Sequence, residues 1–266
     1  MLKFFRKIRY NLMSENKTGK YFKYAIGEII LVVIGILIAL QINNWNENRK
    51  DRLLEQALLK QLRTEFDSNL AQLDEKIKIR QEIIYSASQL LNFIDNPELR
   101  IKDSINRHIA ISVGYTTFDP VTSDLSALGG VNLIRNSELK QLLSFWTTET
   151  IQVTESEQTW YRYRNEIYLP FLIEHYQLRT ARNELIKTNY LKKFQSDKKA
   201  DSYLFRAGGI GKTNFPEDYN HLLSQPDFED HLTRSIVTNN ICDVKSVILR
   251  NHILKILQIL NEEIND

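Results

Sequence analysis

The chain has 266 residues, enough for one or two domains, with a formal net charge of +2 and a single cysteine, Cys242. One cysteine excludes an intramolecular disulfide framework. The charge is uneven, because residues 1–23 hold seven basic residues and one acidic residue, and the remainder is net acidic. The pI of about 8.4 therefore reflects this tail and does not indicate nucleic-acid binding.

Residues 24–42 predict a transmembrane helix. Every position from Ile29 to Leu40 is aliphatic or glycine, whereas a buried helix of a soluble protein usually keeps a polar stripe. At about 1.5 Å per residue the segment spans roughly 28 Å, close to the hydrocarbon thickness of a bilayer. Aromatic residues that suit a membrane interface flank it on both sides: Tyr21, Phe22, Tyr24 and Trp45.

The region before this span is longer than in a typical signal peptide, and the only plausible cleavage residue, Ala39, has Leu37 where a small residue is needed. We therefore expect an uncleaved signal anchor. Because positive charge stays on the cytoplasmic side, the sequence predicts a basic cytoplasmic tail at 1–23, a transmembrane helix at 24–42 and a helical periplasmic domain at 43–266. The predicted location is the inner (plasma) membrane.

Two smaller patterns belong to the same region. Residues 2–13 place Phe5, Ile8 and Leu12 on one helical face among basic residues. This pattern fits either an interfacial helix on an anionic leaflet or a plain basic region for membrane insertion. Within the span, small residues form a ridge at i, i+4 spacing that predicts packing against a second transmembrane helix: Gly27, Gly35 and Ala39, with Leu31 between them.

A long helical pattern follows from Trp45 to Asn92, and Asp95-Asn96-Pro97 ends it. From Phe66 onward its apolar seam alternates steps of four and three, a heptad rhythm, and only Arg80 breaks its apolar character. The predicted seam is Leu59, Leu62, Phe66, Leu70, Leu73, Ile77, Arg80, Ile84, Ala87, Leu91 and Ile94.

Residues 98–136 lack this rhythm, and we expect them to form an irregular cap at the distal tip, between the first long helix and the one that returns beside it. Apolar residues in such a cap are either a partner surface or a plug for the end of the core. The candidates for the partner surface are Tyr115, Phe118, Val121 and Leu125.

Two further long helices are predicted. The first begins near Asn136 or Ser137 and is kinked or restarted at Pro170. Its expected seam is Leu139, Leu142, Trp146, Glu149, Val153, Ser156, Trp160, Tyr163 and Ile167. The second runs from about Asp227 to Glu263 and has Val237, Ile241, Val244 and Ile248 on one face, followed by Ile253, Ile256, Leu260 and Ile264.

The usual signatures of chemistry are absent from the sequence. Gly208–Thr213 resembles the end of a phosphate-binding loop, but Arg206 stands where the motif requires glycine and no helix start follows. We therefore expect no nucleotide binding, and interpret residues 195–220 as an ordered loop or lid. The five histidines show no metal-ligand spacing, and no partnered nucleophile is found. No cofactor or metal is expected.

The opening residues, FFRKIRYNLMSENKTGKYFKYAIGEIILVVIGILIALQINNWNENRKDR, resemble the start of an uncharacterised group of single-span membrane proteins, a domain of unknown function common in Bacteroidota. The segment DLSALGGVNLIRNSELKQLL is similar to that group's second shared stretch, although Gly129-Gly130-Val131 stands where the group usually has serine-glycine-lysine-leucine. The resemblance implies membrane anchoring and a helical body, and it implies no activity.

The sequence as a whole predicts an all-α protein with one N-terminal transmembrane helix and a long-helix bundle or coiled-coil-like body. We interpret it as a non-catalytic, membrane-anchored interaction, scaffold or sensory protein. Its expected partners are the lipid bilayer and a protein partner or a second copy of itself, with no nucleic acid and no nucleotide. The alternatives are an enzyme whose site is assembled from sequence-distant residues, and a bundle-type ligand sensor that acts through a partner.

Overall fold

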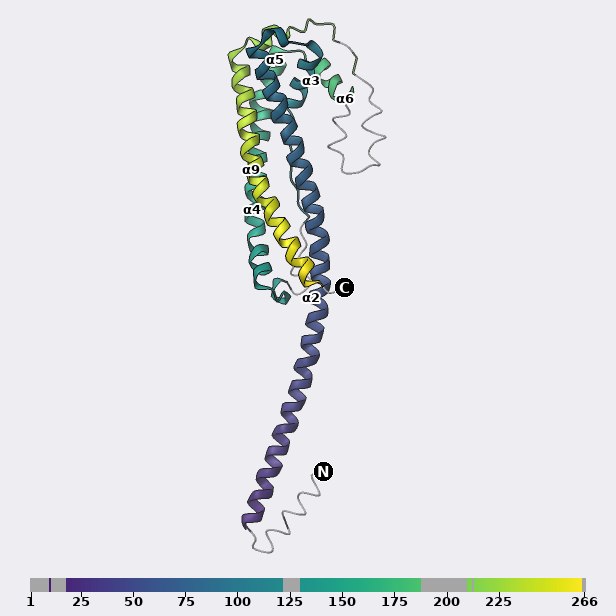
Figure 1. The fold of residues 1–266 in the computed structure, drawn as a ribbon, viewed down its shortest axis with the longest axis vertical. Helices are drawn as coiled ribbons and strands as arrows, with labels where there is room; N and C mark the ends of the chain where they lie inside the picture. Colours follow the sequence, from purple (N-terminus) through teal and green to yellow (C-terminus); the bar gives the residue numbers. More distant parts are fainter. Residues whose placement is uncertain (1–9, 11–17, 122–129, 188–209, 212, 265–266) are drawn as a thin grey trace. The chain divides into compact units, whose positions relative to one another are not determined.

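The computed structural model describes residues 10, 18–121, 130–187, 210–211 and 213–264, and all regular secondary structure in these ranges is helical. The all-α fold class predicted from the sequence is therefore confirmed. The chain divides into two compact units, Met1–Leu58 and Leu59–Asp266, each described by itself below. One helix, α2 (Thr18–Asp95), begins in the first unit and continues into the second (Figure 1).

In the first unit, the aliphatic run of α2 is not covered by any other described residue. The large apolar side chains from Ile29 to Ile42 are between 47% and 63% exposed. In the part of the chain that the structure describes, the stretch beginning at Ala25 is the one helix long and apolar enough to cross a membrane, with a mean hydropathy of 2.6. A helix with this composition and exposure is unstable in water, because apolar surface favours a non-aqueous environment.

In the second unit, three long helices lie side by side: the part of α2 after Leu58, α4 (Ser137–Tyr163) and α9 (Pro226–Glu263) (Figure 1). Helices α4 and α9 are antiparallel, since Glu138 pairs with Lys255 near one end and Tyr163 bonds to His231 near the other. Helix α2 contacts both of them. The rings of Phe66 and Trp146 meet at 4.9 Å, and Arg250 bonds to Asp74 at 2.6 Å.

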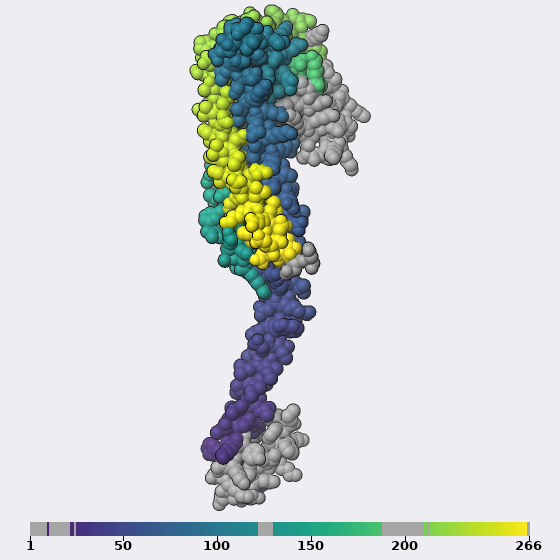
Figure 2. Space-filling view, in the orientation of Figure 1, coloured from purple at the N-terminus to yellow at the C-terminus, as the bar shows by residue number. Residues whose placement is uncertain are grey.

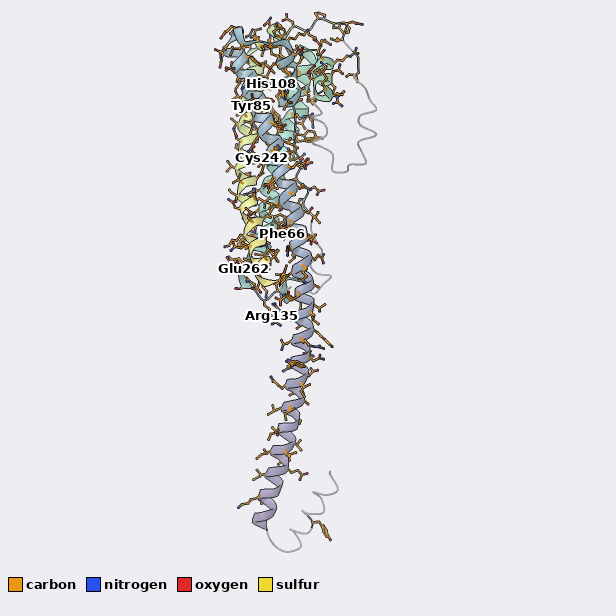
Figure 3. All side chains as sticks on the ribbon, turned by 45° about the vertical axis from the view of Figure 1, so that its right-hand side comes forward. Phe66, Tyr85, His108, Arg135, Cys242 and Glu262 are labelled. Carbon is orange, nitrogen blue, oxygen red and sulfur yellow. The ribbon has the colours of Figure 1, made fainter. Side chains whose placement is uncertain are left out.

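Shorter elements close one end of this bundle around an apolar cluster. They are η1 (Pro97–Leu99), α3 (Lys102–Ser112), the π-helix η4 (Arg164–Tyr168), α5 (Leu169–His175), α6 (Leu178–Lys187) and α8 (Tyr219–Leu223). Their shared core includes Ile105, Ile109, Tyr168, Leu172 and Phe228, all fully buried. Figure 3 places Tyr85 and His108 toward this end of the unit and Phe66 toward the other.

The segment after α3 does not remain at this end, which corrects the expectation of a compact distal cap over 98–136. Residues 114–121 are extended and run back along α2, so that Val121 bonds to the side chain of Asn69. A short 3-10 helix, η3 (Val131–Leu133), precedes α4, and Asn136 caps α4 while bonding to Glu263 near the end of α9. The connection therefore spans much of the bundle's length, because α4 starts at the opposite end from α3.

The seam of α4 also changes register, at the π-helix η4. The predicted heptad places Ile167 in the core, but Ile167 is 48% exposed and Tyr168 is fully buried. The backbone N–H of Leu169 donates to the carbonyl of Arg164, five residues back, which inserts one residue into the turn. Pro170 follows and has no N–H to give to the carbonyl four residues earlier. The extra residue rotates the helix and brings Tyr168 inward, where it bonds to Ser112 at 2.9 Å.

We predict that Tyr168→Ala lowers the free energy of unfolding by about 3–5 kcal/mol, as loss of a buried aromatic ring does. The matched substitution Ile167→Ala should change it by no more than about 0.5 kcal/mol, because the side chain lies at the surface. Thermal or denaturant unfolding of the full chain in detergent measures both. The reverse ranking would mean that the heptad continues through residue 167 without a π-turn.

Candidate functional site

The one charged residue in the seam of α2, Arg80, is buried in the second unit with 1% of its surface exposed. Its guanidinium group makes four hydrogen bonds, to residues of α4, α9 and the extended segment. The acceptors are Asp243 at 2.6 Å, Glu157 at 2.8 Å, Thr116 at 2.8 Å and Ser246 at 2.5 Å. A guanidinium offers its N–H groups in a fixed planar fork, so one side chain sets the relative positions of three helices and a loop.

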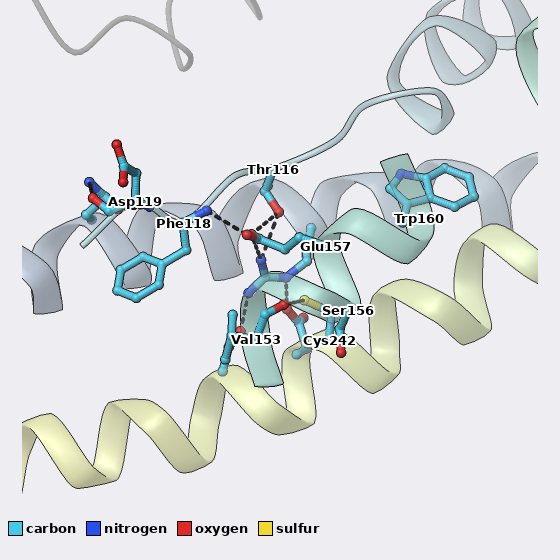
Figure 4. Close-up of polar contacts among 12 residues, drawn as sticks. Thr116, Phe118, Asp119, Val153, Ser156, Glu157, Trp160 and Cys242 are labelled. Atoms are coloured by element: carbon cyan, nitrogen blue, oxygen red, sulfur yellow. Dashed lines mark hydrogen bonds and ion pairs between the residues drawn. The ribbon is translucent and has the colours of Figure 1, made fainter. Parts of the chain in front are cut away.

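The carboxylate of Glu157 carries the network onward to the backbone. One of its oxygens accepts from Arg80 and from the hydroxyl of Thr116, and the other accepts from the N–H of Phe118 at 2.6 Å (Figure 4). On the α9 side, burial raises the pKa of Asp243 above its usual value, although the bond from Arg80 acts in the opposite direction. Burial likewise raises the pKa of the neighbouring Cys242 thiol to about 11, which keeps it protonated at neutral pH.

Side chains of α2 and α4 take the place of a neighbouring strand for residues 113–121. The amide of Asn69 both donates to and accepts from the backbone of Val121, and the amide of Gln72 does the same for Asp119. From α4, Trp160 donates to the carbonyl of Gly114 at 2.7 Å, and Arg164 donates to the carbonyl of Val113. These bonds satisfy backbone groups that an extended segment otherwise leaves unpaired. We call this set of contacts, together with Glu157 and Phe118, the backbone clamp.

Helix α9 presents an unusual pair of faces. Its buried residues from 235 to 246 are small or polar, and Ser246 among them bonds to Arg80: Ser235, Thr238, Asn239, Cys242 and Ser246. Its exposed residues over the same turns are aliphatic. They are Val237 (48% exposed), Ile241 (51%), Val244 (63%), Val247 (46%) and Ile248 (55%), and we call them the outer strip. In Figure 2 the atoms of α9 form a continuous band on the surface of the second unit.

This arrangement inverts the usual amphipathic pattern, in which a surface helix turns its aliphatic stripe to the core. Around Asp243 and Ser246 the polar inner face follows from the charge of Arg80, which requires anionic and hydroxyl partners within reach. With that face used for Asp243 and Ser246, the aliphatic residues of the same turns point outward. An aliphatic strip in water is typical of a surface that contacts another macromolecule.

The residues proposed from the sequence as a partner surface differ in burial. Phe118 is 3% exposed, and Val121 is 50% exposed. Tyr115 is half-buried, with its ring 5.1 Å from that of Tyr161 and the guanidinium of Arg164 4.9 Å from its centroid. Leu125 lies outside the described residues.

The predicted transmembrane ridge lies in the first unit. A Cβ added to Gly27 or Gly35 would meet nothing within 4 Å, so neither glycine is required for packing within the chain. Ala39 is exposed on the same helix.

The glycine-rich loop is only partly described, at Ile210, Gly211 and from Thr213 onward. Asn183 of α6 holds it by accepting from the N–H of Ile210 and donating to the carbonyl of Gly211. A pocket of about 860 Å³ lies here, with Lys102, Asp103 and Glu184 in its wall. Most of the loop or lid predicted at 195–220 lies outside the described residues.

Among the described residues, no group of three or more His, Cys, Asp or Glu side chains is placed to hold a metal ion.

Comparison with known proteins adds one finding. Residues 28–145 match the model of a family of unknown function, DUF6090. No curated protein and no solved structure matches the chain. The DUF6090 match takes in Arg80 and the extended segment that bonds to it, but it ends before Glu157 and before α9.

Sequence reasoning found Arg80 but not its partners. Glu157 is 77 residues away in sequence and Asp243 is 163 residues away, so no local spacing links them. A usable signal was present, because a basic residue in an apolar seam requires a buried carboxylate from a facing helix. The predicted seam of α4 contains a carboxylate at Glu149, but the partner of Arg80 is Glu157, which lies next to the seam position Ser156.

We predict that Arg80→Met lowers the free energy of unfolding by about 3–5 kcal/mol, because it leaves Glu157 and Asp243 buried without their counter-charge. The control is Arg250→Met, which removes the exposed ion pair with Asp74 and should change stability by about 1 kcal/mol or less. Denaturant unfolding of the full chain in detergent compares the two.

Replacing the whole charged set, as Arg80→Met with Glu157→Leu and Asp243→Leu, should recover part of the stability lost in the single variant. Equal and small effects of Arg80→Met and Arg250→Met would contradict a structural role for the network.

Proposed function

We propose that this protein is a non-catalytic, membrane-anchored interaction module whose helical body presents the outer strip of α9 to a protein partner. The outer strip is the single observation that carries the proposal. Five aliphatic side chains, each about half exposed, occupy adjacent turns of one helix. Burying such side chains against a partner is favourable by roughly 25 cal/mol for each Å² of apolar surface removed from water.

The construction of the body supports a scaffolding role. The deeply buried polar groups around Arg80 are joined to one another and to the backbone clamp, in an arrangement that fixes helix positions. Cys242 carries the single thiol of the sequence. It is 1% exposed, and burial raises its pKa, so it is poorly suited to act as a nucleophile. A rigid body with an aliphatic outer face suits recognition by shape and burial.

The anchor in this proposal is the aliphatic part of α2, which has the length and composition to cross a membrane. We further propose that the basic tail stays in the cytoplasm and that the body is periplasmic. Support comes from the seven basic residues and one acidic residue of residues 1–23, set against a net acidic remainder.

For the orientation, a reporter enzyme that is active only in the periplasm should be active when it is fused after Asp266 of the full chain. A reporter that is active only in the cytoplasm, fused at the same place, is the control and should be silent. The opposite pair of results would reverse the topology while leaving the interaction role intact.

For the interaction, a photo-crosslinking amino acid in place of Val244 should yield a covalent adduct heavier than the single chain when intact cells are irradiated. The same amino acid in place of Gln158, an exposed residue of α4, is the matched control and should yield little adduct. Val244 is 63% exposed, so the substitution leaves the core unchanged. Absence of any Val244 adduct would remove the main support for the proposed function.

A further inference from the structure

The outer strip has the spacing of one half of a coiled coil. Val237, Ile241, Val244 and Ile248 are separated by steps of four, three and four residues, which is the heptad rhythm. Val247 lies beside them on the exposed side of α9, and the next step of three leads to the exposed Asn251. The surface that fits this row is another helix with the same spacing. The strip extends about 17 Å along the helix axis at 1.5 Å per residue.

The chain's own α9 meets this requirement. We propose that the outer strip is the contact surface for a second copy of this chain, with the two α9 helices side by side, parallel and in register. This inference rests on the proposed interaction role and names the partner.

Charge is the first argument for a second copy. A parallel, in-register contact brings each residue of the strip close to its own counterpart, so a charged residue in the strip would be repelled. From Val237 to Asn251 the structure describes every residue, and none of the exposed ones is charged. The charged side chains on these turns bond within their own chain: Asp243 and Arg250 form ion pairs with Arg80 and Asp74, and Lys245 donates to Ser156.

The charged residues at the two ends of the strip also contact side chains of their own chain. At one end, the guanidinium of Arg234 lies 5.4 Å from the centre of the Tyr163 ring. At the other end, Lys255 forms an ion pair with Glu138 at 2.5 Å. Both contacts are made to α4 of the same chain and direct the charge toward it. The neutral strip between these two residues is therefore free of like-charge repulsion when two copies meet.

Asn251 decides the direction of the two helices. In a parallel contact it faces Asn251 of the second copy, and two carboxamides satisfy each other because each has a donor and an acceptor. In an antiparallel contact centred on Val244, Asn251 would face Val237, since each lies seven residues from the centre. The amide would then lose water without gaining a partner. A polar residue at one core position of a coiled coil sets register in this way.

The size of the strip fits a dimer that needs help from the membrane. An exposed apolar patch of this kind covers on the order of a few hundred Å². A stable interface between soluble proteins buries about 800 Å² on each partner. Anchoring both chains in one bilayer raises their effective concentration. It also gives both copies the same direction of insertion. We therefore expect a dimer that is strong in membranes and weaker after dilution in detergent.

The test uses two full-length copies with different tags, co-expressed and studied in isolated membranes, each carrying Val237→Cys. A parallel, in-register pair places these two cysteines together, so a mild oxidant should convert most of the protein to a disulfide-linked species that carries both tags. Native Cys242 stays in place because it is 1% exposed. Gln158→Cys on α4 is the control and should give no more cross-linked product than the unaltered chain.

An antiparallel pair would instead join Val237→Cys on one copy to Asn251→Cys on the other, and preferential formation of that product would overturn the parallel arrangement. A second measurement does not depend on disulfide geometry. Val244→Arg should reduce co-localisation of two differently labelled full-length chains in dilute vesicles by at least tenfold, whereas Gln158→Arg should leave it unchanged.

The outcomes separate this inference from the proposed function. If the Val244 photo-adduct contains a different protein and the chain remains monomeric in vesicles, the interaction role stands and the second copy is wrong. If no Val244 adduct of any kind forms and the chain is monomeric, both are wrong.

Discussion

The burial of Arg80 is the constraint on which the second unit depends. A guanidinium group with 1% exposure is stable only when its charge is balanced and its N–H groups are bonded. The balance comes from Glu157 on α4 and Asp243 on α9, so these two helices must pack against α2 at fixed heights. Glu157 also accepts from the backbone of Phe118, which brings the extended segment into the same network. One buried charge therefore accounts for the alignment of three helices and the path of a loop.

The same constraint explains the reversed faces of α9. The turns beside Arg80 use their inward positions for Asp243 and Ser246, and the buried thiol of Cys242 donates to the carbonyl of Val153. The aliphatic residues of those turns then have no place in the core and form the outer strip. A polar inner face and an aliphatic outer face are thus two results of one requirement. The aliphatic outer face links the fold to the proposed function, because it is suited to binding a partner.

The existence of the helices and the apolar stretch in α2 were predictable from the sequence, because periodicity and length depend on nearby residues. The register after Tyr163 was not, since a π-turn before Pro170 moves Tyr168 inward in place of Ile167. The route of residues 114–121 was also missed, because amide side chains of α2 replace a strand partner. For α9, periodicity shows that Val237 and Val244 share a face, but it does not show whether that face is inside or outside. Which face of α9 points inward depends on the bond between Asp243 and Arg80, and these two residues are 163 positions apart in the sequence.

The central claim is that α9 turns its Cys242 side toward Arg80 and its aliphatic side outward. It is tested most directly in the unaltered full chain by the rate at which a thiol reagent modifies Cys242, the single cysteine, as denaturant is added. The account predicts almost no modification under native conditions and a rise only at the global unfolding transition, since the thiol is buried and its pKa is raised to about 11. Rapid modification of the folded chain at neutral pH would place Cys242 at the surface and contradict the orientation of α9.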